Sequence, residues 1–482
     1  MNTEVNFGGN QRWYTRRYQP SSEAEVLDIL ARHSGQTIRV LGSKHSWSNI
    51  AADAAVSIDM SRLDGVELIE RNGEPVVRVG AGCRLQDLLD WLHERTDRTL
   101  PTLGAIKKQT ISGAISTGTH GSGRQSLSHY VARIRAAVFD AASGQPAIRE
   151  FSEGPELKAA RCGLGCMGVI LAVELPTVRK FKIAETVRIR QNLDEILGLY
   201  ADQPLTQFFW APYSWVWLTF ERRPLSEPRL SSWDRVKARV FRVINLVAVD
   251  VVFHCFVIAS RKAGLAGVRS FFTIVPHLML KNRERIDDAE RVLTMKHDLF
   301  RHEEMELFVR EADLGRAMEV VRAAIEICAG TATPVPPDVE KRLREVGAYD
   351  ALLALRGSYV HHYLVFCRRV MPEDTLVSMA ASADQPYYSV SIFTYDRPKR
   401  RQSYYEFCGW LARTLLRLVD ARLHWGKHFP LEHQDIARLY PRLAEFRALC
   451  RTVDPAGVLR NGYTARVLDL PPGPGGGRPR EN

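Results

Sequence analysis

Alternating and helical hydrophobic patterns follow each other along the first hundred residues. The stretch 21–34, SSEAEVLDILARHS, places Ser21 or Ser22 ahead of apolar positions spaced for one helix face, which predicts a capped amphipathic helix. A second helix is predicted over 84–96. Short apolar runs predict strands at 37–43, 54–63 and 74–82. This order of elements predicts an α+β domain of small sheets with helices against them.

A change of composition near Thr177 divides the chain. Residues 161–175, RCGLGCMGVILAVEL, run from a glycine-rich turn into a β-branched strand, and the sequence then changes to aromatic-rich strands, as at 206–220 and 387–395, and long helices. Because 482 residues exceed what one core usually organises, we predict two domains, over 1–178 and 179–470. The Pro- and Gly-rich end, 471–482, predicts a disordered tail.

The distribution of charges and cysteines indicates which kinds of partner and which cellular compartment to expect. The formal net charge is +11, but Lys and Arg are spread beside Asp and Glu instead of forming one basic block. This distribution argues against nucleic acid and favours anionic ligands or an acidic membrane surface. The eight cysteines lie mostly in apolar stretches, which is typical of buried thiols, and the N-terminus has no secretory signal pattern. We therefore expect a cytoplasmic protein.

The apolar stretch 243–260, VINLVAVDVVFHCFVIAS, is long enough to be tested as a membrane span. Asn245, Asp250 and His254 argue against a span, because an ionised group at the bilayer centre costs about 3 kcal/mol or more. Asp250 and His254 lie four residues apart and so share one face of a helix. We predict an amphipathic helix here that is either buried or in peripheral contact with a membrane.

Three glycine-rich segments lie in the predicted first domain: 40–49 (VLGSKHSWSN), 111–123 (ISGAISTGTHGSG) and 161–175. Glycine lets backbone N–H groups approach a phosphate closely, and successive N–H donors form an anion-binding nest. None of the three has the spacing of a Rossmann dinucleotide motif or of a Walker A loop. The segments predict a phosphate-bearing ligand that is held in another way.

These segments, with NFGGNQ at 6–11, HWGKHF at 424–429 and DPAGVLRNGY at 454–463, resemble the vanillyl-alcohol-oxidase superfamily of flavoproteins. The chain is most similar to the sugar 1,4-lactone and alditol oxidases, over nearly its whole length. The resemblance implies a PCMH-type FAD-binding domain of two α+β subdomains and an α+β substrate domain with a large antiparallel sheet. It also implies that the last segment, about 422–470, returns to the flavin.

The same resemblance implies that FAD is the cofactor and that His45 is joined covalently to it, which would make the flavin a stronger oxidant. Thr110 falls where these oxidases place a hydroxyl near the flavin, although a buried hydroxyl bonded to backbone is the alternative. Gly104 falls where oxidases carry glycine and dehydrogenases alanine, which favours oxygen as acceptor. His120 is expected to satisfy backbone groups near the phosphates. The expected cofactor contacts are Gly42, Ser43, Lys44, His45, Ser46, Gly104, Ser112, Gly113, Ser116, Thr117, Gly118, Thr119, Gly121, Gly168, Val169 and Lys427.

The residues expected around the substrate match the family at some positions and differ from it at others. By resemblance, Lys427 would stabilise negative charge on the reduced flavin, His424 would orient that lysine, and Arg368 would anchor substrate oxygens. The family's glutamate two residues before this arginine is Phe366 here. The catalytic set is thus Lys427, Arg368, Thr110 and His424.

The remaining predicted pocket residues make the site less polar than a sugar-alcohol pocket. On a strand, His362, Phe366 and Arg368 would share a face. Ser389 and Ser391 stand where alditol oxidases place a histidine and a threonine. An unpaired buried arginine is costly, so either the substrate carries an acceptor or Glu306 balances the charge. His362 is a candidate base, with a structural core histidine as the alternative.

We therefore predict an FAD-dependent oxidase of a sugar 1,4-lactone, alditol or related alcohol, with hydride transfer to flavin N5 and hydrogen peroxide as product. No metal site is predicted. Two alternatives stay open. One is a membrane-associated dehydrogenase that passes electrons to a quinone or cytochrome, and the other is a flavin-binding protein with lost or altered catalysis.

Overall fold

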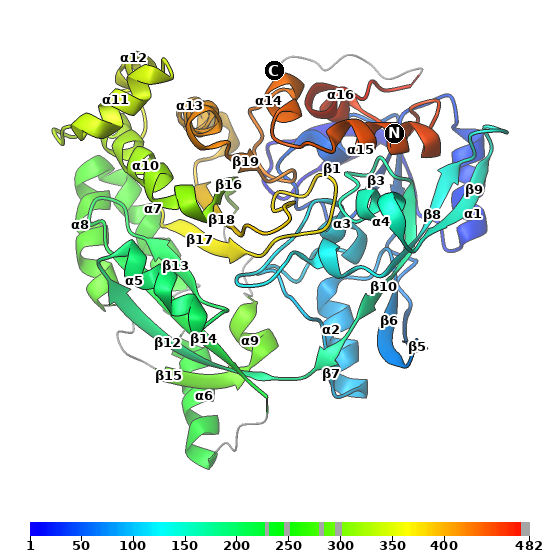
Figure 1. Cartoon of the computed structure of the whole chain (residues 1–482), viewed down its shortest axis with the longest axis horizontal. Helices are drawn as coiled ribbons and strands as arrows, with labels where there is room; N and C mark the ends of the chain where they lie inside the picture. The colour runs from blue at the N-terminus through cyan, green and yellow to red at the C-terminus, as the bar shows by residue number, and fades with distance from the viewer. Residues whose placement is uncertain (227–230, 245–250, 279–283, 295–300, 474–482) are drawn as a thin grey trace.

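The structure is a computed structural model that describes residues 1–226, 231–244, 251–278, 284–294 and 301–473. Figure 1 shows two α+β parts side by side, the N-terminal one in blue and cyan and the second in green and yellow. The red C-terminal segment lies over the N-terminal part.

The first sheet has four strands in the order β1-β2-β4-β3. β4 pairs in parallel with both β2 and β3, while β1 is antiparallel to β2. The predicted helix cap is confirmed, because the Ser22 side chain accepts the Glu25 N–H at the start of α1 (Glu23–Arg32). The strands are β1 (Asn2–Val5), β2 (Arg12–Tyr18), β3 (Ile38–Leu41) and β4 (Val56–Asp59).

The second sheet has five antiparallel strands in the order β5-β6-β10-β8-β9. They are β5 (Val66–Arg71), β6 (Glu74–Gly80), β8 (Arg133–Phe139), β9 (Pro146–Phe151) and β10 (Val169–Pro176). The helices of this part are α2 (Leu85–Arg95), α3 (Ile111–Ser116) and α4 (Gly154–Ala160). A short pair, β7 (Arg98–Thr99) with β11 (Val178–Arg179), leads toward the second part.

The second part is built on eight antiparallel strands in the order β15-β12-β14-β13-β17-β18-β16-β19. The two aromatic runs expected to be strands are strands, since 206–220 contains β13 and the start of β14, and 387–395 contains β18. The strands are β12 (Lys182–Arg190), β13 (Gln207–Trp210), β14 (Trp217–Leu225), β15 (Glu284–Asp288), β16 (Glu303–Arg310), β17 (Val365–Val370), β18 (Tyr387–Thr394) and β19 (Arg422–Leu423).

Helices α10 and α13 pack against each other on this sheet and bury Met305 and Leu307 of β16 between sheet and helices. The other face of β16 carries Glu304 and Glu306, because successive side chains of a strand point to opposite faces. The helices outside the 232–278 segment are α5 (Leu193–Gly198), α9 (Ala289–Leu293), α10 (Leu314–Cys328), α11 (Pro337–Glu345), α12 (Tyr349–Ala354), α13 (Gln402–Val419), α14 (His433–Ala437), α15 (Leu443–Val453) and α16 (Gly462–Leu468).

The segment after β19 contacts the N-terminal part. The Ile38 N–H donates to the Val458 carbonyl (2.8 Å), and the Arg39 guanidinium donates to the Leu459 carbonyl (2.6 Å). The Asn461 amide donates to the Ala52 carbonyl (2.9 Å). Most of the predicted tail, 474–482, lies outside the described residues.

Part of the stretch predicted as a helix, 243–260, lies outside the described residues. α6 (Ser232–Ile244) covers the first two residues of the stretch, α7 (His254–Lys262) begins within it, and α7 and α8 (Gly264–Leu278) form a helical pair. Asn245 and Asp250 lie outside the described residues. Among the residues described, no helix is long and apolar enough to cross a membrane.

Candidate active site

The loop after β3 is held from two sides. The Phe7 N–H donates to the Lys44 carbonyl (2.8 Å), and the Asn6 amide donates to the Ser46 carbonyl (2.9 Å). The Trp47 N–H donates to the Gly426 carbonyl (2.8 Å). The NFGGNQ turn and the HWGK turn therefore fix the loop that carries His45, which explains why motifs so distant in sequence occur together.

A first cleft of about 1080 Å³ opens between the glycine segments. Within the described part of the chain, the Ser43 hydroxyl is buried there without a hydrogen-bond partner, so the cleft presents a polar group that awaits a ligand. Gly168 has a φ of +103°, which a residue with a side chain rarely adopts, and a Cβ there would lie 2.9 Å from the Ala137 carbonyl of β8. The predicted cofactor residues that line this cleft are Gly42, Ser43, Lys44, His45, Ser46, Thr110, Ser112, Gly113, Ser116, Thr117 and Gly168.

Two of these residues also have structural partners. The Thr110 hydroxyl caps α3 by accepting the Gly113 N–H (3.4 Å), and a Cβ on Gly42 would lie 2.4 Å from that hydroxyl. The Lys44 ammonium pairs with the carboxylate of Glu4 (2.7 Å). Thr110 thus orders the start of α3, and the Lys44 charge is already balanced by Glu4.

Four predicted cofactor residues line neither this cleft nor the second one described below: Gly104, Gly118, Gly121 and Val169. A Cβ on Gly104 would lie 2.5 Å from Cγ2 of Thr119, so the glycine leaves room for that methyl group. A Cβ on Gly121 would lie 2.5 Å from the Leu103 carbonyl. These glycines allow close packing behind the cleft instead of lining it.

A second cleft, of about 1120 Å³, adjoins the first. Both clefts are lined by His45, Ser46, Gln109 and Thr117, so they meet at the loop that carries His45. The face of the eight-stranded sheet that looks toward the N-terminal part contributes residues from β16, β17 and β18. A ligand that extends through both clefts would pass His45.

A buried ion pair between Lys427 and Glu304 stands in the second cleft. The Lys427 ammonium also lies 4.4 Å from the centre of the Trp47 ring, a cation–π contact that fixes its position. Burial raises the pKa of Glu304, and the nearby lysine opposes this rise only in part. The predicted catalytic lysine therefore has a carboxylate partner that sequence reasoning missed.

Glu306 and two histidines form a second polar group. His120 Nε2 lies 3.1 Å from the Glu306 carboxylate, and His120 Nδ1 donates to the Gly121 carbonyl (2.9 Å). Burial alone would raise the pKa of Glu306, but the neighbouring His120 and Lys427 hold it well below its usual value. Burial lowers the pKa of His424 to about 3, and its Nδ1 accepts the Gly426 N–H (3.0 Å), which leaves the single proton of the neutral ring on Nε2.

Arg368 lines the second cleft, and its guanidinium makes no hydrogen bond or ion pair with any residue that the structure describes. Glu306, which sequence reasoning named as a balancing carboxylate, is engaged with His120. A half-buried guanidinium offers five donors and no acceptor, so this side chain can bind an oxygen or an anion of a ligand.

An aromatic wall faces these polar groups. The Phe366 ring centre lies 4.2 Å from that of Phe209, 4.8 Å from Phe393 and 5.7 Å from Tyr363. Phe366, Phe393 and Tyr363 line the cleft, as does His254 of α7. The wall replaces the carboxylate that the family resemblance places at position 366.

Three predicted substrate residues do not line the cleft. Ser389 and Ser391 are buried on β18, opposite Arg368 and Phe366 of β17, and lie in the sheet beneath the cleft. His362 Nδ1 donates to the Val360 carbonyl (3.1 Å), and its Nε2 accepts the Tyr395 N–H (3.0 Å). Both ring nitrogens are thus engaged by backbone, so His362 is placed as a structural residue and not as a base.

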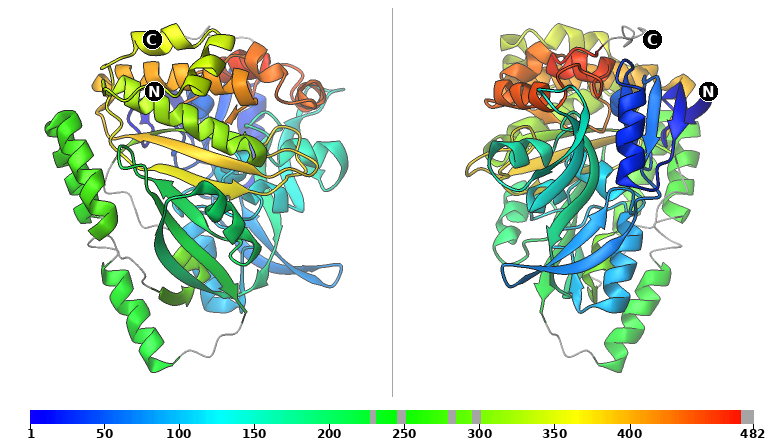
Figure 2. Two further views of the ribbon diagram at one scale, coloured as in Figure 1. Left: turned by 60° about the vertical axis from the view of Figure 1, so that its left-hand side comes forward. Right: turned by 90° about the vertical axis from the view of Figure 1, so that its right-hand side faces the viewer.

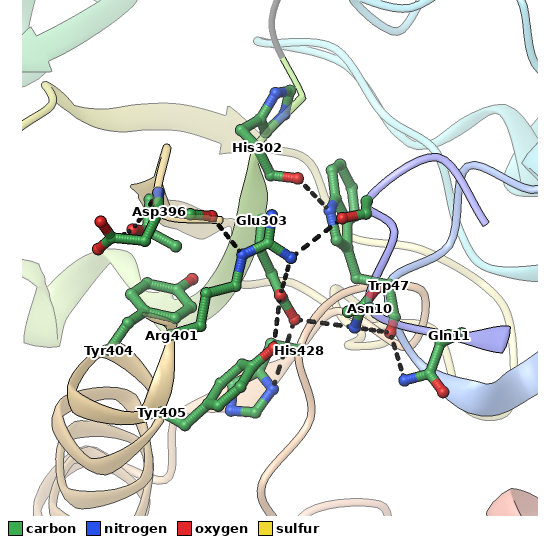
Figure 3. Close-up of polar contacts among 12 residues, drawn as sticks. Asn10, Gln11, Trp47, His302, Glu303, Asp396, Arg401, Tyr404, Tyr405 and His428 are labelled. Carbon is green, nitrogen blue, oxygen red and sulfur yellow. Dashed lines mark hydrogen bonds and ion pairs between the residues drawn. The ribbon is translucent and has the colours of Figure 1, made fainter. Parts of the chain in front are cut away.

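A buried cluster behind the cleft supports the loop (Figure 3). The Arg401 guanidinium pairs with the Glu303 carboxylate (2.6 Å), which also accepts from the Tyr405 hydroxyl (2.7 Å) and the Asn10 amide (3.1 Å). The Asn10 amide in turn donates to the Trp47 carbonyl (2.9 Å). Glu303 and Glu304 point to opposite faces of β16, so one strand holds the loop from behind and Lys427 from the front.

Comparison with known proteins identifies the chain. Residues 16–144 match the FAD binding domain family, and residues 173–467 match the D-arabinono-1,4-lactone oxidase family. The chain belongs to the D-arabinono-1,4-lactone oxidase family. The predicted resemblance, the FAD cofactor and the class of FAD-dependent oxidoreductase are therefore confirmed.

The chain is similar along nearly its whole length to two relatives and to one solved structure. The chain is 40% identical over 472 residues to a long-chain alcohol oxidase of an uncultured marine euryarchaeote, covering 96% of each chain. It is 25% identical over 469 residues to the L-gulonolactone oxidase of Bos taurus, covering 94% of each. The crystal structure of cholesterol oxidase from B. sterolicum has a TM-score of 0.68 at 13% identity, over 97% and 96% of the two chains, which confirms the predicted fold class.

The residues present fit FAD. The two clefts join at His45, the first has the glycine-rich backbone and the unpaired Ser43 hydroxyl that suit phosphate oxygens, and the second has Lys427. Sequence reasoning missed Trp47, Glu304 and the cleft side of α7. The alternation of Glu304 and Glu306 in EEMELFVR was the signal that could have found the carboxylates.

Proposed function

We propose that this family member is an FAD-dependent oxidase that converts the CH–OH group of a long-chain aliphatic alcohol into a carbonyl group. The observation that carries the proposal is the aromatic wall around Phe366, which suits an alkyl chain and offers few partners to the hydroxyls of a sugar lactone or alditol. The relative at 40% identity is named a long-chain alcohol oxidase. The sequence alone predicted a sugar 1,4-lactone, an alditol or a related alcohol, and this proposal selects a long-chain aliphatic alcohol instead of the sugar-derived substrates.

In this proposal the first cleft and its glycine segments hold FAD, and His45 is the point of covalent attachment. When bound, FAD supplies the acceptor that takes a hydride from the carbinol carbon and passes both electrons to dioxygen, which leaves as hydrogen peroxide. The hydroxyl proton passes to water as the carbonyl forms, and an equal proton from water completes the hydrogen peroxide, so that alcohol and dioxygen give carbonyl product and peroxide in a one-to-one ratio. The free thiols, seven of them buried, support a cytoplasmic location.

The side chains of the second cleft then have separate roles. Lys427, held by Glu304 and Trp47, provides a positive charge whose position is fixed before the substrate binds. Arg368 donates hydrogen bonds to the substrate oxygen. His424 remains neutral and offers its Nε2–H as a further donor, because its Nδ1 is occupied by the Gly426 N–H.

Substrate preference tests the proposal. The holoenzyme is mixed without oxygen with 1-octanol, 1-decanol, xylitol or L-gulono-1,4-lactone, and loss of the visible flavin band is followed. We expect kcat/KM to rise about fourfold per added methylene until the cleft is filled, since each buried CH₂ is worth about 0.8 kcal/mol. A preference for xylitol or the lactone would overturn it.

Acceptor and residue roles need separate measurements. In air, peroxide should form in proportion to the alcohol consumed; if only an artificial acceptor is reduced, the protein is the dehydrogenase alternative.

Arg368→Ala should lower kcat/KM about ten- to a hundredfold with the flavin retained, with Arg368→Lys as the matched partial replacement. Phe366→Glu should reduce decanol oxidation more than Phe366→Leu does.

A further inference from the structure

The large hydrophobic side chains that the structure exposes are concentrated in one segment. Of the eleven exposed ones among the described residues, four are scattered, at Met1, Tyr14, Leu68 and Leu353. The other seven are Trp233, Val236, Val240, Val251, Val252, Phe256 and Ile274. They lie on or beside α6, α7 and α8, and Figure 2 shows these green helices along one edge of the molecule, outside the eight-stranded sheet.

Each helix also has a buried face, so the exposed residues are the outer side of amphipathic elements. On α6, Trp233, Val236 and Val240 follow each other at spacings of three and four, while Phe241 is buried with its ring 4.6 Å from the Arg285 guanidinium. On α7 and α8, Phe253 and Phe271 are buried against each other, with ring centres 5.4 Å apart. The inner faces hold the helices on the protein, and the outer faces remain apolar and solvent-exposed.

Basic residues surround the exposed apolar ones. Residues 232–278 contain seven Lys or Arg against two Asp and no Glu. Lys237, Arg239, Lys262 and Arg269 are exposed, and none of them makes an ion pair with a residue that the structure describes. A mixture of apolar and unpaired cationic side chains is complementary to anionic headgroups over hydrocarbon, and argues against a second copy of the same basic surface.

The same segment borders the active site. His254 of α7 lines the second cleft, and its Nε2 lies 3.3 Å from the hydroxyl of Tyr363, which also lines it. The Phe253 ring centre lies 5.6 Å from that of Tyr363. One wall of the cleft is thus attached to the inner face of α7, whose outer face exposes Phe256.

We propose that α6, α7 and α8 form a docking surface for an anionic phospholipid bilayer, which they contact at the interface without crossing it. Trp233, Phe256 and Ile274 insert among the acyl chains, and the exposed Lys and Arg contact the headgroups. An apolar alcohol dissolved in the bilayer would reach the cleft beside α7 without entering water. The docking is argued from the helices alone. The transfer of an alcohol from the bilayer to the cleft also rests on the proposed function.

Vesicle binding tests the docking. The holoenzyme is floated with vesicles of phosphatidylcholine, or of phosphatidylcholine with phosphatidylglycerol, both free of substrate. We expect tighter binding to the anionic vesicles, weakened by salt. The variant W233S/F256S/I274S should bind at least about tenfold more weakly, because it removes apolar surface that enters the interface. The control Y14S/L68S/L353S, which removes exposed apolar side chains elsewhere, should bind like wild type.

A second variant removes charge without changing the apolar face. K237E/R239E should lose the preference for anionic vesicles, since each Lys or Arg near such a surface contributes to attraction. Far-UV circular dichroism and oxidation of a detergent-solubilised alcohol check that both variants are folded. Oxidation of the same alcohol held in vesicles should fall only in the docking variants.

The outcomes separate this inference from the proposed function. If vesicles are bound but no long-chain alcohol is oxidised, the docking holds and the proposed substrate is wrong. If alcohols are oxidised but wild type does not float, or W233S/F256S/I274S floats as well as wild type, the docking is overturned. It is also overturned if light scattering shows a dimer that these substitutions dissociate, because the helices would then be a protein interface.

Discussion

Replacing Arg401 by methionine tests the buried cluster that holds the cofactor loop. The Arg401 side chain is 1% exposed, and its guanidinium donates to the Glu303 carboxylate (2.6 Å), the Gly8 carbonyl (3.1 Å) and the Asp396 carbonyl (2.7 Å). Without it, Glu303 keeps hydrogen bonds from neutral partners only. Removing one member of a buried ion pair costs about 3–5 kcal/mol.

The expected shift in melting temperature follows from the size of the chain. With an unfolding entropy of about 2.1 cal/mol/K per residue, 482 residues give about 1 kcal/mol/K, so Arg401→Met should lower Tm by about 3–5 °C. The neighbouring Arg400 is exposed, and Arg400→Met should change stability by no more than about 0.5 kcal/mol. Tm is read by calorimetry and by the rise in flavin fluorescence as the protein unfolds.

A double-mutant cycle separates the ion pair from general damage. Glu303→Leu combined with Arg401→Met should be less destabilising than the sum of the single substitutions by about 0.5–3 kcal/mol. Because Asn10 links Glu303 to the Trp47 carbonyl, Arg401→Met should also loosen the flavin site, seen as a rise in flavin fluorescence below the Tm. If both arginine variants melt at the wild-type temperature, the cluster does not support the loop as argued.

Three further predictions address the clefts. His45→Ala should transfer the yellow colour from the acid-precipitated protein to the supernatant, and colour that stays in the pellet refutes the covalent link. Gly104→Ala should cost about 1–3 kcal/mol, because the new Cβ would lie 2.5 Å from Cγ2 of Thr119, and adding Thr119→Ser should restore the loss. Burial lowers the pKa of five histidines among the described residues, so the unfolded chain takes up protons below about pH 6.5 while the folded protein does not, and Tm should fall between about pH 6.5 and 4. The pKa is about 3 for His361, His362 and His424 and about 4 for His428, and it is also lowered in His129; a flat Tm profile contradicts this.

Local patterns predicted the elements better than the contacts between them. The Ser22 cap, the helix over 84–96 and the aromatic strand at 387–395 follow from spacing within one segment, and the structure has all three. The ion-pair partner of Lys427 does not follow from spacing, nor does it follow that Arg368 makes no ion pair with any described residue. Glu304 reaches Lys427 only because β16 pairs with β18 and β19, and the register of strands so distant in sequence is set by the whole sheet.

The same limit explains the substrate residues that were misplaced. Ser389 and Ser391 share the cleft-facing side of the sheet with Arg368 and Phe366, but their short side chains lie beneath longer neighbours. His362 precedes β17 instead of belonging to it, so the alternation assumed for it ends before that position. Side-chain length and strand limits, not the choice of face, decided which residues line the cleft.

The arrangement of β16 separates redox chemistry from substrate choice. Glu303 supports the loop from one face of the strand, and Glu304 and Glu306 hold Lys427 and His120 on the other. The aromatic wall instead comes from Phe366 on β17, Phe393 on β18 and Tyr363 just before β17, beside α7. Substitution of the wall can therefore change which alcohol enters while the charges near His45 stay in place. This independence is a physical reason why one family can include enzymes named for sugar lactones and for long-chain alcohols.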